Sequence, residues 1–430
     1  MIGKVNVRIC SHVNVNAMRA PVDSPFNPGA DTPPRIWAGR NQQLSDWNNI
    51  LRPRRLTGVD DRGRTFLGEA GVGKSSLVRT IAYDAENRGD WVTDQIRIPL
   101  GSDPMKRLAG ELLNLANRSG LSTRPRKHIK DILTRVSSIA AFGVSLGLRE
   151  YQEGDEPYVA MTKLLVELGR AAAAQGVMVM VHLDEVQNIT DDATLSQVLT
   201  ALGDALSTQI TVAVPGGREI RRHLPLAVYL TGLPEFEDMA HAQQGATFAR
   251  RFLTNTLRPV TDNDMAAALQ GILVDGWEVP DGDGGTSRVY LAPDARDAII
   301  DLSKGEPFLF QLAGAYGWYA GDSDTITRED VLAGWSLVES EAVSHVRRIL
   351  DRLPTKERQF IEAMAEVDPG ERTLSSIAAA AGYASSQQTG AVPQRLDQVR
   401  GIIERGKHYA FRHRAIEAYL TSDWPTSGQN

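Results

Sequence analysis

Two kinds of hydrophobic pattern alternate along the chain up to about residue 260. Short apolar runs over 65–67, 177–183 and 226–230 have the length of buried strands in a parallel sheet. Between them, apolar residues recur every three or four positions, which is the spacing of one face of an amphipathic helix. This spacing predicts helices over 74–87, 104–118, 126–139, 156–175 and 193–207. Strands that alternate with helices in this way indicate an α/β domain.

Beyond about residue 260 the pattern is mostly helical, with an Asp/Gly-rich loop within 276–288. Toward the C-terminus it predicts four helices, then a strand, a tight turn and a second strand over 401–411, and a final helix. The four helices are expected over 344–352, 355–366, 373–381 and 390–399. This order of elements predicts a winged-helix module.

Two further segments interrupt the regular pattern. Residues 142–148 alternate between apolar and small positions with period two, which predicts an inserted strand or hairpin arm. Prolines, glycine and asparagine punctuate residues 1–35, and we expect this segment to be flexible and weakly structured.

Composition narrows the class of protein only a little. The 430 residues are 42% hydrophobic and 23% charged, which is ordinary for a globular protein and long enough for two or three domains. A formal net charge of −6 argues against a broadly basic nucleic-acid coat, although a local basic patch stays open. The one cysteine, Cys10, excludes an intramolecular disulfide framework and suits a reducing compartment. No apolar run approaches membrane-spanning length and the first residues lack the apolar stretch of a signal peptide, so we expect a cytoplasmic protein without a membrane contact.

A complete P-loop follows the first predicted strand. It consists of Gly68, Glu69, Ala70, Gly71, Val72, Gly73, Lys74 and Ser75, with Ser76 next in the chain. The glycines allow successive backbone N–H groups to point at phosphate oxygens, and the following helix adds a favourable dipole. Lys74 can reach the β- and γ-phosphates, and Ser75 can give its hydroxyl to Mg²⁺. The pattern therefore predicts a site for ATP and Mg²⁺.

A second motif ends the apolar run over 177–183. Asp184 and Glu185 follow it directly, at the end of a strand that faces the ligand crevice of an open α/β sheet. Asp184 is expected to hold Mg²⁺ through water, as in a Walker B motif, and Glu185 to orient and polarise the attacking water. Phosphoryl transfer needs positioning and charge neutralisation more than covalent chemistry, so these few groups suffice for an ATPase.

In their order along the chain, these motifs resemble the AAA+/STAND ATPases, and more narrowly the bacterial and archaeal relatives of the origin-recognition initiator ATPases. The resemblance covers roughly residues 26–422. It implies that Gly39 and Arg40 lie near the adenine, and that Thr231 is the polar sensor beside Walker B. It also implies that Arg250 or Arg251 is an arginine finger, acting in the same chain or a neighbouring one. Pro307 matches the Gly-x-Pro element of STAND lids, whose proline packs near adenine.

The sequence departs from the initiator pattern at one point. Initiator ATPases carry a second sensor arginine early in a lid helix, but residues 308–321 contain no arginine or lysine. This absence favours the STAND-like branch. The expected fold is therefore an α/β P-loop domain with a parallel sheet, followed by an α-helical lid and a winged helix. The expected divisions are a segment over 1–35, the P-loop domain over 36–258, the lid over 259–342, the winged helix over 343–424 and a tail over 425–430.

The function expected from the sequence is a Mg²⁺·ATP-dependent switch that hydrolyses ATP slowly. Residues 395–414 carry six basic and two acidic residues, so the winged helix could contact duplex DNA through phosphates. Alternatively, it packs on the ATPase domain or docks a protein partner. Nucleotide-dependent self-association is expected through the arginine finger. The rival functions are an ATP-bound scaffold in a signalling or defence pair, and a DNA loader of the transposition or replication type.

Overall fold

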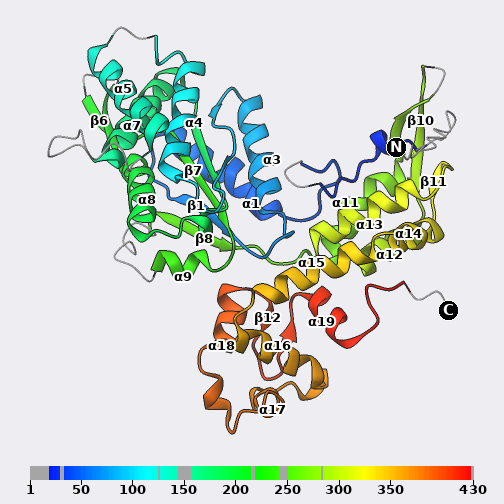
Figure 1. Ribbon diagram of the computed structural model, residues 1–430. Coiled ribbons are helices and arrows are strands. Elements are labelled where there is room, and N and C mark those ends of the chain that lie inside the picture. The colour runs from blue at the N-terminus through cyan, green and yellow to red at the C-terminus, as the bar shows by residue number, and fades with distance from the viewer. Residues whose placement is uncertain are drawn as a thin grey trace, which may run out of the picture.

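The computed structural model describes residues 19–29, 33–123, 126–143, 156–214, 218–241, 250–281 and 284–427. Three parts can be followed in Figure 1: an α/β body, a group of helices beside it that forms the lid, and a C-terminal group of helices below both. No helix in the described part of the chain is long and apolar enough to cross a bilayer.

The body is built on a parallel sheet. Its strands are β1 (Gly63–Leu67), β2 (Trp91–Val92), β3 (Ile96–Arg97), β4 (Val179–Asp184), β7 (Leu226–Gly232) and β8 (Phe252–Thr256). The order is β2-β4-β7-β1-β8, with β3 also paired to β4, and every pairing is parallel. The carboxyl ends of β1, β4 and β7 therefore meet at one edge of the sheet, as the strand-ending motifs require.

Helices cover both faces of this sheet. They are α1 (Asn41–Ser45), α2 (Arg52–Leu56), α3 (Lys74–Asn87), α4 (Pro104–Arg118), α5 (Lys127–Phe142), α7 (Pro157–Gln175), α8 (Asp192–Ser207) and α9 (Phe236–His241). Side chains of β4 alternate between the two faces, because Val179 and Val181 join one hydrophobic cluster and Met180 joins the other. Burial on both faces explains why this strand is a continuous apolar run in the sequence.

The structure contains strands that the sequence pattern did not predict. The antiparallel hairpin of β5 (Gln209–Val214) and β6 (Arg218–His223) was not predicted, although its first strand alternates polar and apolar residues. The Asp/Gly-rich loop expected within 276–288 falls between two strands that were also not predicted, β9 (Trp277–Pro280) and β10 (Thr286–Leu291), which pair as a hairpin and are extended by β11 (Thr325–Ile326). The strand expected over 142–148 lies almost wholly outside the described residues, and Phe142 ends α5.

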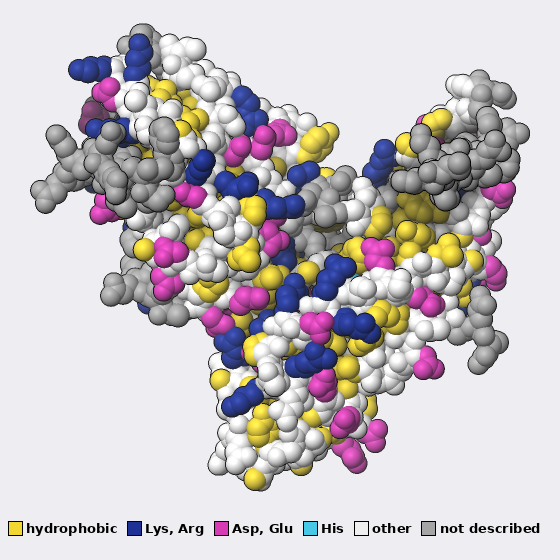
Figure 2. Space-filling view, in the orientation of Figure 1, with side chains coloured by type: hydrophobic (Ala, Val, Ile, Leu, Met, Phe, Trp, Pro, Cys, Tyr) yellow, Lys and Arg dark blue, Asp and Glu magenta, His cyan; other side chains and the backbone are white. Residues whose placement is uncertain are grey.

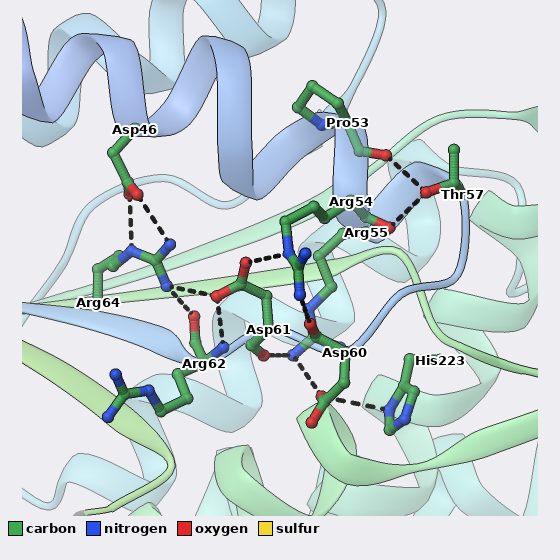
Figure 3. Close-up of polar contacts among 10 residues, drawn as sticks. All are labelled: Asp46, Pro53, Arg54, Arg55, Thr57, Asp60, Asp61, Arg62, Arg64 and His223. Carbon is green, nitrogen blue, oxygen red and sulfur yellow. Dashed lines mark hydrogen bonds and ion pairs between the residues drawn. The ribbon is translucent and has the colours of Figure 1, made fainter.

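A polar network fixes the amino-terminal edge of the sheet (Figure 3). The buried guanidinium of Arg64 in β1 donates to both carboxylate oxygens of Asp46, at 2.7 and 3.0 Å, and to Asp61 at 3.0 Å. Asp60 lies 3.4 Å from the ring of His223, which ends β6. The network thus joins the first helices, β1 and the β5–β6 hairpin on the side of the sheet away from the P-loop.

The lid holds the N-terminal segment. It contains α11 (Asp262–Val274), α12 (Pro293–Ser303), α13 (Pro307–Tyr319) and α14 (Arg328–Ser336). Arg19 is buried and donates to Asp330 at 3.0 Å, and Phe26 packs edge-to-face on Phe310. Residues 19–29 have little regular structure, as expected, and buried contacts tie them to the lid. The flexibility expected for the segment over 1–35 stays a prediction.

One helix joins the lid to the C-terminal group. The group contains α15 (Glu339–Arg352), α16 (Thr355–Glu366), α17 (Leu374–Ala380), α18 (Val392–Gln394), the antiparallel pair β12 (Ile403–Glu404) and β13 (Ala410–Phe411), and α19 (Arg414–Thr421). A single hydrophobic cluster includes Leu309 of the lid, Val346 and Ile349 of α15, and Phe360 of α16. The division expected after residue 342 therefore falls inside α15, which belongs to both cores.

The tail also packs on the protein. Trp335 donates its indole N–H to the carbonyl of Pro425 at 2.6 Å, and Glu339 accepts from the backbone N–H of Ser427 at 2.8 Å. The last part of the described chain is therefore anchored at the junction of α14 and α15.

Candidate nucleotide-binding site

A cavity of about 590 Å³ lies where the body, the lid and α15 meet. Figure 2 shows a hollow between the body and the lid on this face, with dark-blue basic side chains gathered near the middle where α15 passes. The cavity is lined by P-loop residues 70–76, by parts of the N-terminal segment, by the start of α13 and by one side of α15. Its volume is in the range of small-molecule and cofactor pockets.

The P-loop has the backbone that anion binding requires. Gly71 and Gly73 have φ of 82° and 88°, in the left-handed region that favours glycine. A side chain at Gly71 would also collide with the neighbouring ring, because its Cβ would lie 2.4 Å from Cε1 of His345. The helix α3 begins at Lys74, so its N-terminal N–H groups face the loop.

Lys74 lies at the base of the cavity. Its side chain is only 8% exposed, and Nζ donates to the carbonyls of Gly68 at 2.8 Å and Glu69 at 3.0 Å. Burial lowers the pKa of Lys74, although the carboxylates of Glu69, Glu185 and Asp184 act in the opposite direction. An additional anion in the cavity would stabilise this buried ammonium, which is the property of a phosphate-binding lysine.

The Walker B aspartate is held in a hydrogen-bond network. Asp184 accepts from the hydroxyl of Ser75 at 3.0 Å and from that of Thr231 at 2.5 Å. Gln95, which precedes β3, also donates to Asp184, and His182 lies 3.0 Å from the Thr231 hydroxyl. Burial opposes the charge of Asp184, but His182 and the three donors outweigh it and keep the pKa of Asp184 low. A fixed, ionised carboxylate next to a serine hydroxyl suits Mg²⁺.

Glu185 faces the same cavity. It has a left-handed backbone, with φ of 61°, and its carboxylate accepts a hydrogen bond from Gln187. Gln187 in turn accepts from the backbone N–H of Leu233 at 2.9 Å, just after β7. The carboxylate expected to activate water is therefore oriented from two strand ends.

Thr231 lies beside Asp184, as the resemblance implies, but does not itself line the cavity. It is completely buried at the end of β7, and its hydroxyl bonds to Asp184 rather than lining the cavity. The structure thus pairs the expected sensor with the carboxylate that would hold the metal.

The residues expected near adenine lie on the lid side. Arg40 lines the cavity, donates to the carbonyl of Val72 at 2.8 Å and directly precedes α1. Burial lowers the pKa of Arg40 to about 10 even though Glu306 and Asp264 favour its charge. Pro307 lines the cavity as the first residue of α13, whereas Gly39 packs on Val260. An adenine role for these residues remains a prediction.

One side of α15 contributes residues that sequence reasoning missed. Glu341, His345, Arg348 and Arg352 line the cavity. Arg352 donates to Glu69 of the P-loop at 2.7 Å. The lid helix α13 lacks the arginine that initiator ATPases carry, but α15 brings basic residues to the same cavity. Their spacing of three or four positions places them on one helix face, but only packing shows which face meets the P-loop.

No protein-family model matches the chain, and no curated protein matches it in sequence. Comparison with solved structures does find similar folds. A Walker-type ATPase of Pyrococcus abyssi is 14% identical with a TM-score of 0.53, over 89% of this chain and 96% of that one. The ORC2 protein of Aeropyrum pernix, solved as ADPNP–ADP complexes, is 12% identical with a TM-score of 0.53, over 92% of this chain and 95% of that one.

The chain has the fold of an ORC-like AAA+ ATPase. The expected fold class, an α/β P-loop core with a parallel sheet, is therefore confirmed. The parallel pairing of β1, β7 and β4 explains why the two strand-ending motifs share one edge of the sheet.

The AAA+ sheet separates the expected arginine finger from the site in its own chain. Gly63 begins β1 and pairs with Phe252, which begins β8, so Arg251 lies at the amino-terminal edge. The P-loop follows the other end of β1, roughly 16 Å away for five residues of strand. Arg251 also forms an ion pair with Asp204 of α8. The structure thus does not bring Arg251 to the site of its own chain. The finger role of Arg250 or Arg251, in the same chain or a neighbouring one, remains a prediction.

The basic residues over 395–414 are mostly paired within the protein. Five of the six take part in ion pairs: Arg395 with Asp238 and Glu357, Arg400 with Glu69, Glu235 and Glu357, Arg405 with Asp397, Arg412 with Asp397 and Glu404, and Arg414 with Asp262. Arg400 is only 4% exposed. Much of the charge that suggested DNA contact therefore joins the C-terminal group to the body and the lid.

A second buried ionic contact lies behind the cavity. Glu306, which precedes α13, is fully buried 2.7 Å from Nδ1 of His413 and 3.8 Å from Nε2 of His345. Burial opposes the charge of Glu306, but the two histidines outweigh it and hold the pKa of Glu306 well below its usual range. This contact connects the lid, α15 and the segment before α19.

Proposed function

We propose that the chain is a Mg²⁺-dependent ATPase of the AAA+/STAND class that couples its nucleotide state to the C-terminal group of helices. The observation that carries the proposal is the convergence of Lys74, Glu185 and the Ser75–Asp184 pair at one cavity. A phosphate cradle, a metal pair and a carboxylate for water are the parts that phosphoryl transfer needs.

Each residue has a role that its position supports. Lys74 neutralises phosphate charge, and the backbone of 70–76 holds the phosphates. Ser75 and Asp184 would hold Mg²⁺, which would supply positive charge to the phosphate oxygens. Glu185 accepts a proton from the attacking water. Thr231 acts through Asp184 by fixing the orientation of that carboxylate.

Titration of a fluorescent ATP analogue tests the site. Lys74→Ala removes a charged hydrogen-bond donor, a loss of about 1.5–3 kcal/mol, so affinity should fall roughly 10- to 150-fold. Lys356→Ala is the control, because Lys356 is exposed on α16. Equal affinities for the wild type and Lys74→Ala would refute the nucleotide site.

We infer that the C-terminal group, which we interpret as a winged helix, acts mainly by packing on the ATPase domain. The ion pairs of Arg395 and Arg400 with the body support this role over a free DNA-binding surface. A slow hydrolysis step would restore the packing of the C-terminal group on the ATPase domain.

DNA transaction is the second candidate function, and it makes a different prediction. ATP turnover would rise with duplex DNA, and binding would weaken steeply with salt because phosphate contacts release counterions. Turnover should be measured with and without duplex DNA in rising salt. Stimulation by DNA would favour a DNA loader, and stimulation only by a protein partner would favour a signalling switch.

A further inference from the structure

The P-loop of this chain carries a buried carboxylate that faces the C-terminal group. Glu69 is 1% exposed and lies outside the lining of the cavity. Its two oxygens approach two arginines, Arg352 of α15 at 2.7 Å and Arg400 at 3.5 Å. The loop that is expected to bind an anion thus also carries an anionic side chain. The two arginines that pair with Glu69 both come from the C-terminal part of the chain.

Arg352 belongs to two sites at once. It lines the nucleotide cavity, and its side chain is 31% exposed while it holds Glu69. Arg348, one turn earlier on α15, lines the cavity as well. A guanidinium binds carboxylate and phosphate oxygens with the same planar donors, so the two anions are direct competitors for it.

Arg400 is held much more firmly. It is 4% exposed and pairs with Glu357 of α16, and it lies 3.6 Å from Glu235 of the body. Arg400 therefore stays with the C-terminal group, whereas Arg352 is the partner of Glu69 that a ligand in the cavity can reach.

We propose that Glu69 and the terminal phosphate of a nucleoside triphosphate compete for Arg352. Without that phosphate, Glu69 holds Arg352 and the C-terminal group has two ion pairs with the P-loop. With it, Arg352 turns to the phosphate and one of the two pairs is lost. Arg352 is thus a positioning residue that distinguishes triphosphate from diphosphate. Competition from Glu69 lowers the affinity for the triphosphate. This inference rests on the proposed nucleotide site.

If Glu69 and the phosphate compete for Arg352, substitutions of Arg352 and of Glu69 should change the affinity for the ATP analogue in opposite directions. Arg352→Gln should weaken binding of a non-hydrolysable ATP analogue about tenfold and leave ADP affinity within about twofold. Glu69→Gln removes the competitor, so it should strengthen analogue binding about threefold or more. In the Arg352→Gln background, Glu69→Gln should have no effect on analogue affinity, because the residue for which the anions compete is gone.

Arg347→Gln is the matched control. Arg347 lies on the same helix but is exposed and donates to the Tyr419 hydroxyl at 3.2 Å, outside the cavity. Arg347→Gln should change neither the affinity for the ATP analogue nor the affinity for ADP. If Glu69→Gln and Arg352→Gln both weaken the analogue and ADP to the same extent, the ion pair is only a structural brace and the proposal is refuted.

A measurement on the wild type decides the matter if a variant does not fold. Amide hydrogen exchange over 346–353, at the end of α15, should rise with the analogue relative to ADP, because the tie of Arg352 to the P-loop is released. Equal exchange in both states would overturn the proposal. Failure of the proposed function is distinguishable, since the wild type would then bind neither nucleotide better than Lys74→Ala does.

Discussion

Replacing Arg400 with methionine tests how strongly the C-terminal group is held on the body. Methionine keeps most of the stem and removes the charge. Arg400 lies 3.5 Å from Glu69, 3.6 Å from Glu235 and within hydrogen-bonding distance of Glu357. Removing one partner of a buried ion pair costs about 3–5 kcal/mol, because the remaining charge is left uncompensated.

The remaining contacts place the expected loss at the lower end of that range. Glu69 keeps Arg352 at 2.7 Å, and Glu357 keeps Arg395 at 2.9 Å. We therefore expect Arg400→Met to lower the free energy of unfolding by about 3 kcal/mol.

Denaturant unfolding followed by circular dichroism measures this change. Because the chain has several parts, the transition that contains the C-terminal group has to be resolved before a free energy is assigned. Arg405→Met is the control, since Arg405 is 35% exposed and its pair with Asp397 should contribute only about 0–1 kcal/mol. If the two variants lose the same stability, the buried ion pairs do not fix the group and the reasoning is wrong.

Three further predictions follow from the site. Glu185→Gln should bind the ATP analogue normally but hydrolyse ATP roughly 10²- to 10⁴-fold more slowly in single-turnover assays, and unchanged turnover would exclude Glu185 as the base. Burial opposes the charge on His413, but Glu306 outweighs it and raises the pKa of His413 above its ordinary value of 6.5. Stability from this pair should be complete below about pH 6.5 and lost as the pH rises through the raised pKa, while the low pKa of Glu306 keeps that carboxylate charged. His413→Gln should therefore flatten the alkaline loss in denaturation curves, and an unchanged curve would contradict the assignment. Light scattering with the analogue should show self-association that Arg250→Ala or Arg251→Ala weakens, and a strict monomer at high concentration would count against a finger at a neighbouring site.

The sequence by itself determined the parts of the site whose geometry is local. Three glycines and a lysine within eight positions specify the loop and the start of α3, because each backbone angle depends on its immediate neighbours. Asp184 and Glu185 follow a continuous apolar run, so their place at a strand end also follows from the chain. Both motifs lie at one edge of the sheet, which the parallel pairing of β1, β4 and β7 makes necessary.

Tertiary packing alone decided which distant residues meet these motifs. Arg352 and Glu69 are 283 positions apart, and no local pattern relates them. The charge over 395–414 was plain in the sequence, but whether it meets solvent or the carboxylates of the body depends on how the C-terminal group docks. Arg250 and Arg251 were found as a motif, yet only the sheet register places them at the edge away from the P-loop. Ion pairs are short-range contacts between side chains, so the sequence supplies the charges and the fold chooses their partners.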